Sequence, residues 1–359
     1  GSLAQVHFCT QPHSLTCAWC AMSDLGGGVG SRGMHWDQTP RKQGLYDPSN
    51  ESDACGVGAV MDMKQRKSRN ILTDARDMVV RMAHRGAKQA NENDGDGVGI
   101  LLSVPDEFLR ANCPFPLPPA EEYGVGNIFL PQQSEKREDC VKLVERMARK
   151  LGLRLLGWRM PLPVNSSVLG PYAQCTEPFI AQVFLGDQSG GPDAGDSESD
   201  AAAKAKLPGR ARQARHLGIA GKSVSSTSLA RLSLECKLFL VRRAIALRSQ
   251  ELFICSLSSR TITYKGQFKP DQLFEYYLDL RSEQCTAFLA VVHSRFSTNS
   301  FPAWHRAHPF RRIAHNGEIN TLEGNRNQVR AREALMQHSE AFGNLPLETF
   351  FPVDEDIGS

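Results

Sequence analysis

The sequence predicts an α+β domain made of stacked layers of sheet and helix. Short apolar segments rich in β-branched residues follow one another in hairpin-like succession. Two or three longer segments, whose apolar residues recur at the spacing of a helix turn, interrupt this succession. Strands in series with a few helices between them are typical of the α+β class. No internal repeat is visible along the chain.

The first predicted elements follow a polar stretch. Residues 55–61 form a compact apolar segment, which predicts a strand. Apolar residues at helical spacing then predict a helix that begins near Asp74 and ends before His84. The glycine-rich stretch 91–99 predicts a turn that leads into a strand at 98–104.

The middle of the chain alternates strands with amphipathic helices. Apolar positions at helical spacing predict helices at 136–151 and 229–247, and Pro270 at a helix start predicts a short helix that ends near Tyr277. Further apolar segments predict strands at 125–130, 153–158, 178–185, 252–256, 261–265 and 287–293. A last helix is predicted at 321–336. Residues 186–228 are rich in Gly, Ser, Ala and Asp and then turn basic, which predicts a flexible insertion outside the core.

Bulk composition limits the class of protein. The chain has 359 residues, a net charge of +3 and a hydrophobic fraction of 41%, which indicate a soluble chain with one large domain, or two. Charges of both signs are evenly mixed, which argues against a nucleic-acid partner. No apolar run approaches the ~18 residues that a membrane span requires. The ten cysteines follow no framework spacing, so we interpret them as reduced thiols in an intracellular compartment.

Residues 1–54 are predicted to be a flexible leader. They contain no apolar core of a signal peptide, and the chain begins at Gly1 rather than Met, so we expect a fragment or a processed product. The leader is basic and carries glycine and serine. A segment that targets a plastid or a mitochondrion therefore stays open as an alternative to a cytoplasmic location.

The stretch 293–327 carries the candidate binding groups. Arg295 follows an apolar strand and can hold a carboxylate with two hydrogen bonds. Asn316 can direct its side-chain amide at a developing oxyanion, and Gly317 lets its backbone N–H approach the same point. The alternative for each residue alone is a loop cap or an ordinary Asn-Gly turn.

Cys55 is the candidate nucleophile. It stands where the polar leader meets an apolar strand, and glycines follow it. If the Ala54–Cys55 bond were cleaved, Cys55 would carry a free α-amine with a pKa of about 7.7, which suits a general base at neutral pH. A nucleophile paired with an N-terminal amine is a known mode of activation. The alternative is a buried structural thiol.

These residues lie in motifs that resemble a known family. The motifs are GLYDP from Gly44, DACGVG, MAHRGA, GDGVGI, HSRFSTNSFPAWHRAHPFR and HNGEINTLEGNRN. The sequence resembles the glutamine amidotransferase domain of glutamate synthases, a class II amidotransferase with an N-terminal nucleophile. The resemblance covers residues 44–185 and 229–359, and leaves out the first forty-odd residues and the 186–228 insertion.

The resemblance implies a four-layer αββα sandwich over residues 55–359, with residues 1–54 as a propeptide and Cys55 as the mature N-terminus. It implies that Arg295 holds the α-carboxylate of L-glutamine. By the same resemblance the pocket is shaped by Phe296, Thr298 and Asn299, and the oxyanion hole is formed by Asn316 and Gly317. The aspartate that the family supplies for the α-ammonium group would follow Ser359, so we expect a C-terminally truncated domain.

The resemblance also implies the reaction. Glutamine would be hydrolysed to glutamate and ammonia through a Cys55 thioester, and the ammonia would pass to 2-oxoglutarate in the synthase domains of the parent chain. This piece would need no cofactor, whereas the parent would use FMN, a 3Fe–4S cluster and either NAD(P)H or ferredoxin. The electron donor and the compartment stay open.

Two other functions are weighed against this one. Histidines 305, 308 and 315 could serve a metal-dependent hydrolase, but the arginines among them would repel a cation, so no metal is assigned. Asp94 and Asp96 could likewise bind a cation, although Asp-Gly pairs usually form turns. A non-catalytic or zymogen-like fragment of the same fold is the other alternative.

Overall fold

The structure is a computed structural model, and it describes most of the chain between Gly56 and His315. The described residues are 42, 44, 45, 47, 56–86, 91–188, 232–295, 300–315, 323–325, 327, 328, 331 and 332. The predicted leader lies outside these residues except at four positions. The predicted insertion lies outside them from residue 189 to residue 228.

The first sheet contains four antiparallel strands in the order β1-β8-β2-β7. The strands are β1 (Val57–Met61), β2 (Val98–Ser103), β7 (Thr261–Gly266) and β8 (Leu289–Ser294). Helix α1 (Arg69–Arg81) packs on β1 and β8 through an apolar stripe of Ile71, Leu72, Ala75 and Val79. Burial of this stripe against the sheet holds the helix in place, because an isolated helix of this length is marginal in water.

The second sheet contains four antiparallel strands in the order β4-β5-β3-β6. They are β3 (Tyr123–Leu130), β4 (Leu153–Arg159), β5 (Phe179–Asp187) and β6 (Phe253–Ile254). Helices α3 (Ser134–Lys150) and α7 (Leu234–Ala246) share one apolar core with this sheet. Apart from two short helices, the chain order is β3-α3-β4-β5-α7-β6, which is the βαββαβ arrangement.

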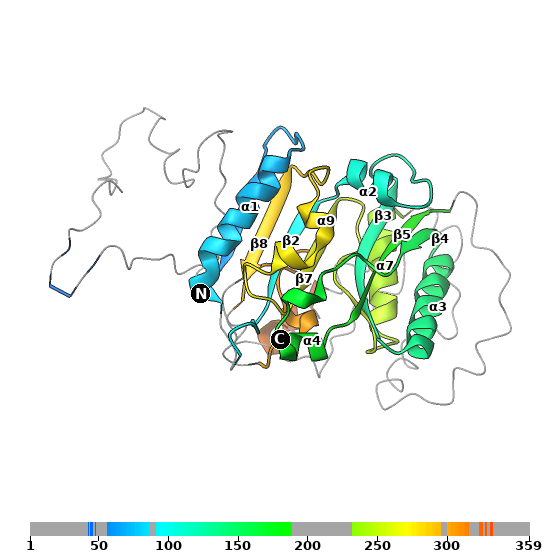
Figure 1. The fold of residues 1–359 in the computed structure, drawn as a ribbon. Coiled ribbons are helices and arrows are strands. Elements are labelled where there is room, and N and C mark those ends of the chain that lie inside the picture. The colour runs from blue at the N-terminus through cyan, green and yellow to red at the C-terminus, as the bar shows by residue number, and fades with distance from the viewer. Residues whose placement is uncertain are drawn as a thin grey trace.

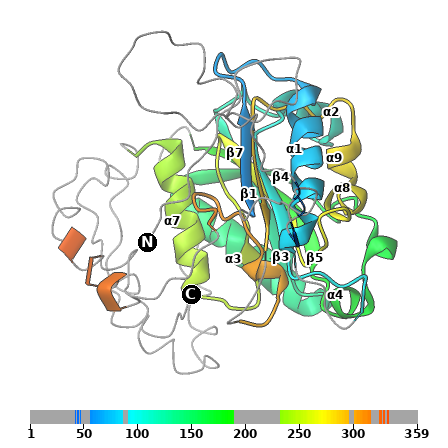
Figure 2. The same ribbon diagram turned by 90° about the vertical axis from the view of Figure 1, so that its left-hand side faces the viewer.

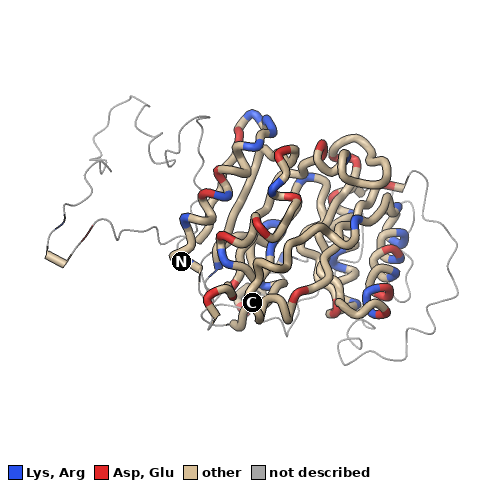
Figure 3. Tube along the Cα trace, viewed as in Figure 1, with Lys and Arg blue, Asp and Glu red and all other residues tan. Residues whose placement is uncertain are grey.

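Outer helices enclose the sheets on both sides. Figure 1 shows α1 at one end of the molecule and α3 at the other, and Figure 2 shows α1 and α7 on opposite sides of the strands. The α+β class is therefore confirmed, as a sandwich in which two antiparallel sheets lie between helices. The colouring by residue type in Figure 3 shows positions of Lys or Arg and of Asp or Glu interspersed along α1 and α3. None of the described helices is long and apolar enough to cross a membrane.

The short helices account for most differences from the sequence prediction. The structure adds η3 (Met82–Arg85), α2 (Asp106–Asn112), η4 (Ser166–Val168), α4 (Pro171–Cys175) and η6 (Trp304–Arg306). The predicted helix after Pro270 consists of two pieces, α8 (Leu273–Tyr276) and α9 (Leu278–Arg281). Of the predicted 321–336 helix, the described residues 323–325, 327, 328, 331 and 332 are helical.

Two predicted boundaries were wrong for identifiable reasons. Helix α1 starts at Arg69 rather than near Asp74, because Ile71 and Leu72 already face the core. Strand β5 continues to Asp187, which pairs with Leu153, so the first two residues of the predicted 186–228 insertion belong to the sheet.

A buried ion pair joins the two sheets. The Arg159 guanidinium donates from Nη1 to Asp279 Oδ2 at 2.9 Å and from Nη2 to Asp279 Oδ1 at 3.0 Å. Gln182 on β5 accepts from Arg159 at 2.6 Å, and Tyr264 on β7 donates to Asp279 at 3.2 Å. Burial lowers the pKa of Arg159, but its bonds to Asp279 outweigh burial and raise it. The network links β4 and β5 of the second sheet to β7 of the first.

Breaking this pair should destabilise the fold strongly. Asp279→Asn leaves the Arg159 charge buried without its counter-ion, and we expect the free energy of unfolding to fall by about 3–5 kcal/mol. The measurement is urea denaturation followed by circular dichroism. Glu275→Gln is the matched control, because it removes the exposed Arg281–Glu275 pair at 3.2 Å and should cost less than about 1 kcal/mol. Equal losses in the two variants would contradict this account.

Candidate active site at one end of the first sheet

Three strand ends meet at one end of the first sheet. Strand β8 lies between β1 and β2, with His293 opposite Val57 and Ser294 opposite Val98. The Ser294 N–H donates to the Gly56 carbonyl at 2.8 Å. The next amide of the chain, that of Arg295, donates to the Gly97 carbonyl at 2.9 Å. Arg295 is thereby held beside the start of β1 and the start of β2.

The segment of residues 300–310, here named the 300–310 segment, packs directly on β2. A Cβ atom at Gly99 would lie 2.4 Å from the His308 carbonyl oxygen, so this position requires glycine for the close approach. Gly97 has a φ of +147°, and a Cβ there would lie 3.1 Å from the Ala307 Cβ. The glycines of the GDGVGI motif therefore allow the 300–310 segment to pack closely against β2.

The side chain of Lys265 on β7 binds the 300–310 segment. Its ammonium group donates to the His305 carbonyl at 2.9 Å and to the Ala307 carbonyl at 2.8 Å. The same group lies 3.9 Å from the centre of the Phe310 ring and 4.7 Å from that of Phe253. Burial lowers the pKa of Lys265 to about 8. Two carbonyls and two aromatic faces stabilise the buried cation, which in turn fixes the path of the segment.

Arg295 is half-buried and contacts the start of the same segment. Its Nη2 atom donates to Ser300 Oγ at 2.6 Å. Burial lowers the pKa of the guanidinium, the Asp96 carboxylate raises it, and the Arg306 charge lowers it further. The group remains positively charged at neutral pH and is partly desolvated, so an incoming carboxylate would interact with it more strongly than with a fully hydrated arginine.

The His293 and His308 rings stack near Arg295, and the His315 ring meets that of His308 edge-on. The His293 Nε2 atom lies 2.8 Å from the His315 carbonyl oxygen. Ring centres are 4.8 Å apart for His293 and His308, and 5.0 Å apart for His308 and His315. His293 belongs to β8, in agreement with the strand predicted at 287–293. Among the residues that the structure describes, no group of three or more His, Cys, Asp or Glu side chains could hold a metal ion.

The predicted site residues are described only in part. Arg295 is described, whereas six others lie outside the described residues: Cys55, Phe296, Thr298, Asn299, Asn316 and Gly317. Three of their chain neighbours, Gly56, Ser300 and His315, are described and have the contacts given above. Sequence reasoning missed Ser300 and Lys265. The signal for Lys265 was a charged residue inside the strand predicted at 261–265.

Asp94 has a structural role in this region. Its carboxylate accepts from the Ala173 N–H at 2.9 Å and from the Tyr172 N–H at 3.3 Å, at the start of α4. These bonds satisfy N–H groups that a helix leaves unpaired at its first turn. The turn interpretation of Asp94 is therefore favoured over the cation interpretation.

The stacked histidines predict that stability falls in mild acid. Burial lowers the pKa of His293 to about 4 and that of His308 to about 3. In the unfolded chain both would titrate near about 6.5. As the pH falls below about 6.5, the unfolded chain binds protons that the folded chain does not, so each histidine reduces the unfolding free energy by up to about 1.4 kcal/mol per pH unit.

Denaturant unfolding between about pH 7 and pH 5 measures this slope, a window in which histidine is the side chain that ordinarily titrates. His308→Gln should flatten it, and the exposed His84→Gln variant should leave it unchanged. A slope that is the same in all three proteins would show that the stacked histidines do not cause it.

Comparison with known proteins assigns a family. The family model of class II glutamine amidotransferases matches residues 55–207 and 206–359. The glutamate synthase [NADPH] large chain of Bacillus subtilis is 37% identical over 327 residues, which cover 91% of this chain and 19% of that protein. The glutamate synthase [NADH] of Saccharomyces cerevisiae is 37% identical over 331 residues, which cover 89% of this chain and 14% of that protein.

A plant relative gives the same result. The chloroplastic ferredoxin-dependent glutamate synthase of Oryza sativa subsp. japonica is 36% identical over 297 residues, covering 82% of this chain and 16% of that protein. The chain thus spans less than a fifth of the length of these three relatives. Both the family model and the relatives cover most of the chain, so this chain belongs to the class II glutamine amidotransferases.

Proposed function

We propose that this chain hydrolyses the side-chain amide of L-glutamine, with Cys55 as the nucleophile, as the amidotransferase part of a glutamate synthase. One observation carries the proposal. The described neighbours of the predicted groups converge at one end of the first sheet, where Gly56 and His315 both bond to the last residues of β8. The membership of the family supports the reaction class.

The convergence follows from chain connectivity. Gly56 directly follows Cys55, Arg295 precedes Phe296, and Ser300 follows Asn299. His315 directly precedes Asn316, and consecutive Cα atoms are only about 3.8 Å apart. The proposed nucleophile Cys55 is therefore one residue from Gly56, which is bonded to β8. The proposed oxyanion donors, Asn316 and Gly317, are one and two residues from His315, which is also bonded to β8, and Arg295 directly follows this strand.

The proposed reaction begins with maturation. Cleavage of the Ala54–Cys55 bond would free the Cys55 α-amine, which takes the thiol proton directly or through one water. The thiolate attacks the side-chain carbonyl of glutamine and forms a tetrahedral intermediate. The protonated amine then gives its proton to the departing ammonia, which leaves a thioester. Water hydrolyses the thioester to glutamate and regenerates the thiol.

Substrate contacts divide into binding and stabilisation. Arg295 would hold the α-carboxylate, and the pocket around it would be shaped by Phe296, Thr298 and Asn299. The Asn316 side chain and the Gly317 N–H would stabilise the oxyanion, an effect typically worth ~3–4 kcal/mol per donor. The Arg295 charge suits this role, since the structure places it half-buried beside the strand end.

In the parent protein the ammonia would pass to 2-oxoglutarate in the synthase domains and yield a second glutamate. FMN, a 3Fe–4S cluster and the electron donor would belong to those domains, and no step proposed for this chain uses them. The relatives are named for NADPH, NADH or ferredoxin, so the donor of this parent is left open among the three. A relative is named chloroplastic, and an organellar location is the corresponding proposal here.

Maturation and labelling test the nucleophile. In the parent chain expressed in its own host, we expect N-terminal sequencing and intact mass to give Cys55 as the first residue. A glutamine-analogue electrophile should label that sulfur, and Cys55→Ala should lose both label and glutaminase activity. Cys285→Ala is the matched control, because this thiol is buried in the core. An intact leader with unlabelled Cys55 would instead support the zymogen-like alternative.

Substitution of the arginine tests substrate binding. Arg295→Met removes charge-assisted hydrogen bonds to the carboxylate, and one such bond is worth about 1.5–3 kcal/mol, so kcat/KM for glutamine should fall by at least roughly 10- to 150-fold. Steady-state glutaminase assays measure the effect. Arg306→Met is the control, because Arg306 contributes to the local field at Arg295 but bonds to the Phe301 carbonyl. Similar losses in both variants would indicate a general field effect and contradict the specific contact.

A further inference from the structure

Lys265 is a buried cation whose partners are carbonyl groups rather than a carboxylate. The residue is fully buried on β7, and its ammonium group donates to the carbonyls of His305 and Ala307. Within the described part of the chain, no carboxylate pairs with this ammonium group. A buried lysine is ordinarily paired, because removing its charge from water is costly. A methionine of similar length would fill the space without that cost, so packing alone does not explain the ammonium group.

The segment that Lys265 binds leads to the glutamine site proposed above. The 300–310 segment begins at Ser300, whose hydroxyl accepts a hydrogen bond from Arg295 at 2.6 Å. Gly99, which lies opposite Lys265 in the β2–β7 pair, packs closely against the far end of the same segment. Strands β2 and β7 thus hold one end of the segment, and the other end contacts Arg295.

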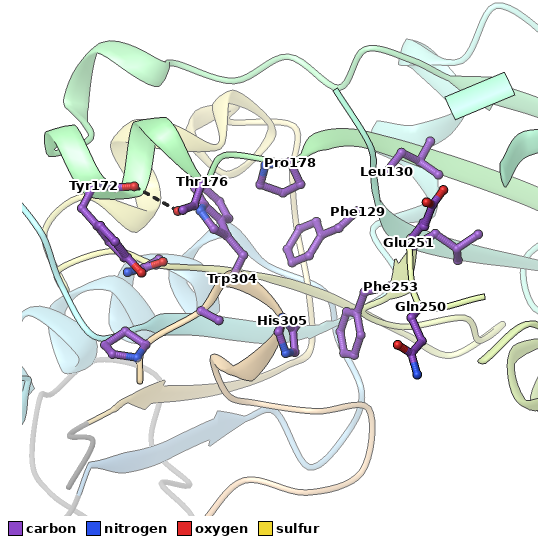
Figure 4. Close-up of a pocket in the computed structure, with 14 residues that line it drawn as sticks. Phe129, Leu130, Tyr172, Thr176, Pro178, Gln250, Glu251, Phe253, Trp304 and His305 are labelled. Atoms are coloured by element: carbon purple, nitrogen blue, oxygen red, sulfur yellow. Dashed lines mark hydrogen bonds between the residues drawn. The ribbon is translucent and has the colours of Figure 1, made fainter. Parts of the chain in front are cut away.

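Aromatic side chains hold the 300–310 segment in a different way. Figure 4 shows Trp304 and His305 beside Phe129 and Phe253 of the second sheet. Ring centres are 5.9 Å apart for Phe129 and Trp304, and 5.7 Å apart for Phe253 and His305. These contacts hold side chains of the segment, whereas Lys265 holds its backbone. Loss of the ammonium group should therefore loosen the backbone without releasing the segment from the core.

The charge of Lys265 also acts on the site through space. The Arg295 charge lowers the pKa of Lys265, so the two cations are close enough to repel each other. A carboxylate bound to Arg295 would offset this repulsion and favour the protonated form of Lys265. Because coupling between two binding events is reciprocal, the proton on Lys265 must strengthen carboxylate binding by the same factor.

We propose that Lys265 is a positioning residue for the glutamine site, where its ammonium group holds the 300–310 segment so that Ser300 keeps Arg295 in place for the substrate carboxylate. Lys265 itself does not touch the substrate, so its effect falls on glutamine affinity rather than on the chemical step. This inference rests on the proposed function, because it takes Arg295 as the group that binds the carboxylate.

The proposal predicts that glutamine binding weakens at alkaline pH. Burial lowers the pKa of Lys265 to about 8, so the ammonium group loses its proton as the pH rises through that value. The other groups in electrostatic contact with Lys265 are Cys255, Arg295, His305 and His308. Burial raises the pKa of the Cys255 thiol to about 12 and lowers the pKa values of both histidines. These three groups therefore stay neutral between pH 7 and pH 9, and Arg295 stays charged.

Substitution of Lys265 in the full parent chain tests the role in binding. Lys265→Met should raise KM for glutamine at pH 7 roughly tenfold, because a misplacement of about 1 Å can cost up to roughly 100-fold. The change in kcat should stay below about twofold, since lost binding that is equal in the ground and transition states raises KM alone. Lys237→Met is the matched control, because Lys237 is also buried but lies on α7 and pairs with Asp187 at 2.5 Å.

The pH profile is a readout that a purely structural role would not move. The inhibitor 4-carbamoylbutanoate is glutamine without its α-amine, so it carries no group that titrates between pH 7 and pH 9. If the protonated form of Lys265 binds it roughly tenfold more tightly, its affinity should fall about fivefold across this range. The fall should be smaller in Lys265→Met and should persist in Lys237→Met. The Cys55 α-amine titrates in all three proteins, so the difference between them isolates Lys265.

Two results would overturn this inference alone, in a parent chain that hydrolyses glutamine. One is a KM or a pH profile in Lys265→Met that equals that of the control. The other is an inhibitor affinity in the unsubstituted protein that does not weaken between pH 7 and pH 9. This second measurement needs no variant, so it decides the matter even if Lys265→Met fails to fold. A parent chain that neither binds nor hydrolyses glutamine would overturn the proposed function, and this inference with it.

Discussion

Strand β8 determines the geometry of the candidate site, because it pairs with β1 on one side and β2 on the other. The amides of Ser294 and Arg295, which follow each other in the chain, bond to Gly56 and Gly97 in different neighbours. A backbone N–H buried away from water must find a partner, so this pairing is obligatory rather than optional. These backbone hydrogen bonds alone are sufficient to hold Arg295 beside the start of β1.

The side chains around β8 place positive charge in a partly dry environment. Lys265 is buried and held by carbonyls, while Arg295 is half-buried beside Asp96. The neighbouring histidines are neutral because burial lowers their pKa values. The guanidinium of Arg295 is therefore the group in this region whose positive charge does not depend on pH near neutrality. This distribution suits a substrate that carries a carboxylate, since the attraction would persist across the physiological pH range.

Local sequence patterns predicted most of the secondary structure, but not the features that depend on contacts between distant parts of the chain. Alternating or continuous apolar runs located every strand of both sheets, since burial is a direct consequence of residue type. Helix α4 could not be predicted, because its first turn depends on Asp94, 79 positions before Ala173 in the chain. In the candidate site, Arg295 was found from its position after a strand. Ser300 was not, because its contact depends on how the following segment folds back.

The second sheet has a notable position in the chain. Ser103 at the end of β2 lies opposite Thr261 at the start of β7, so the two strands are hairpin partners separated by residues 104–260. Topologically, that entire βαββαβ unit occupies the place of a hairpin loop. Closing a loop of this length from an unfolded chain is entropically costly. The second sheet and its helices are thus a long connection between two paired strands of the first sheet, and the core that the two sheets share offsets the cost of closing it.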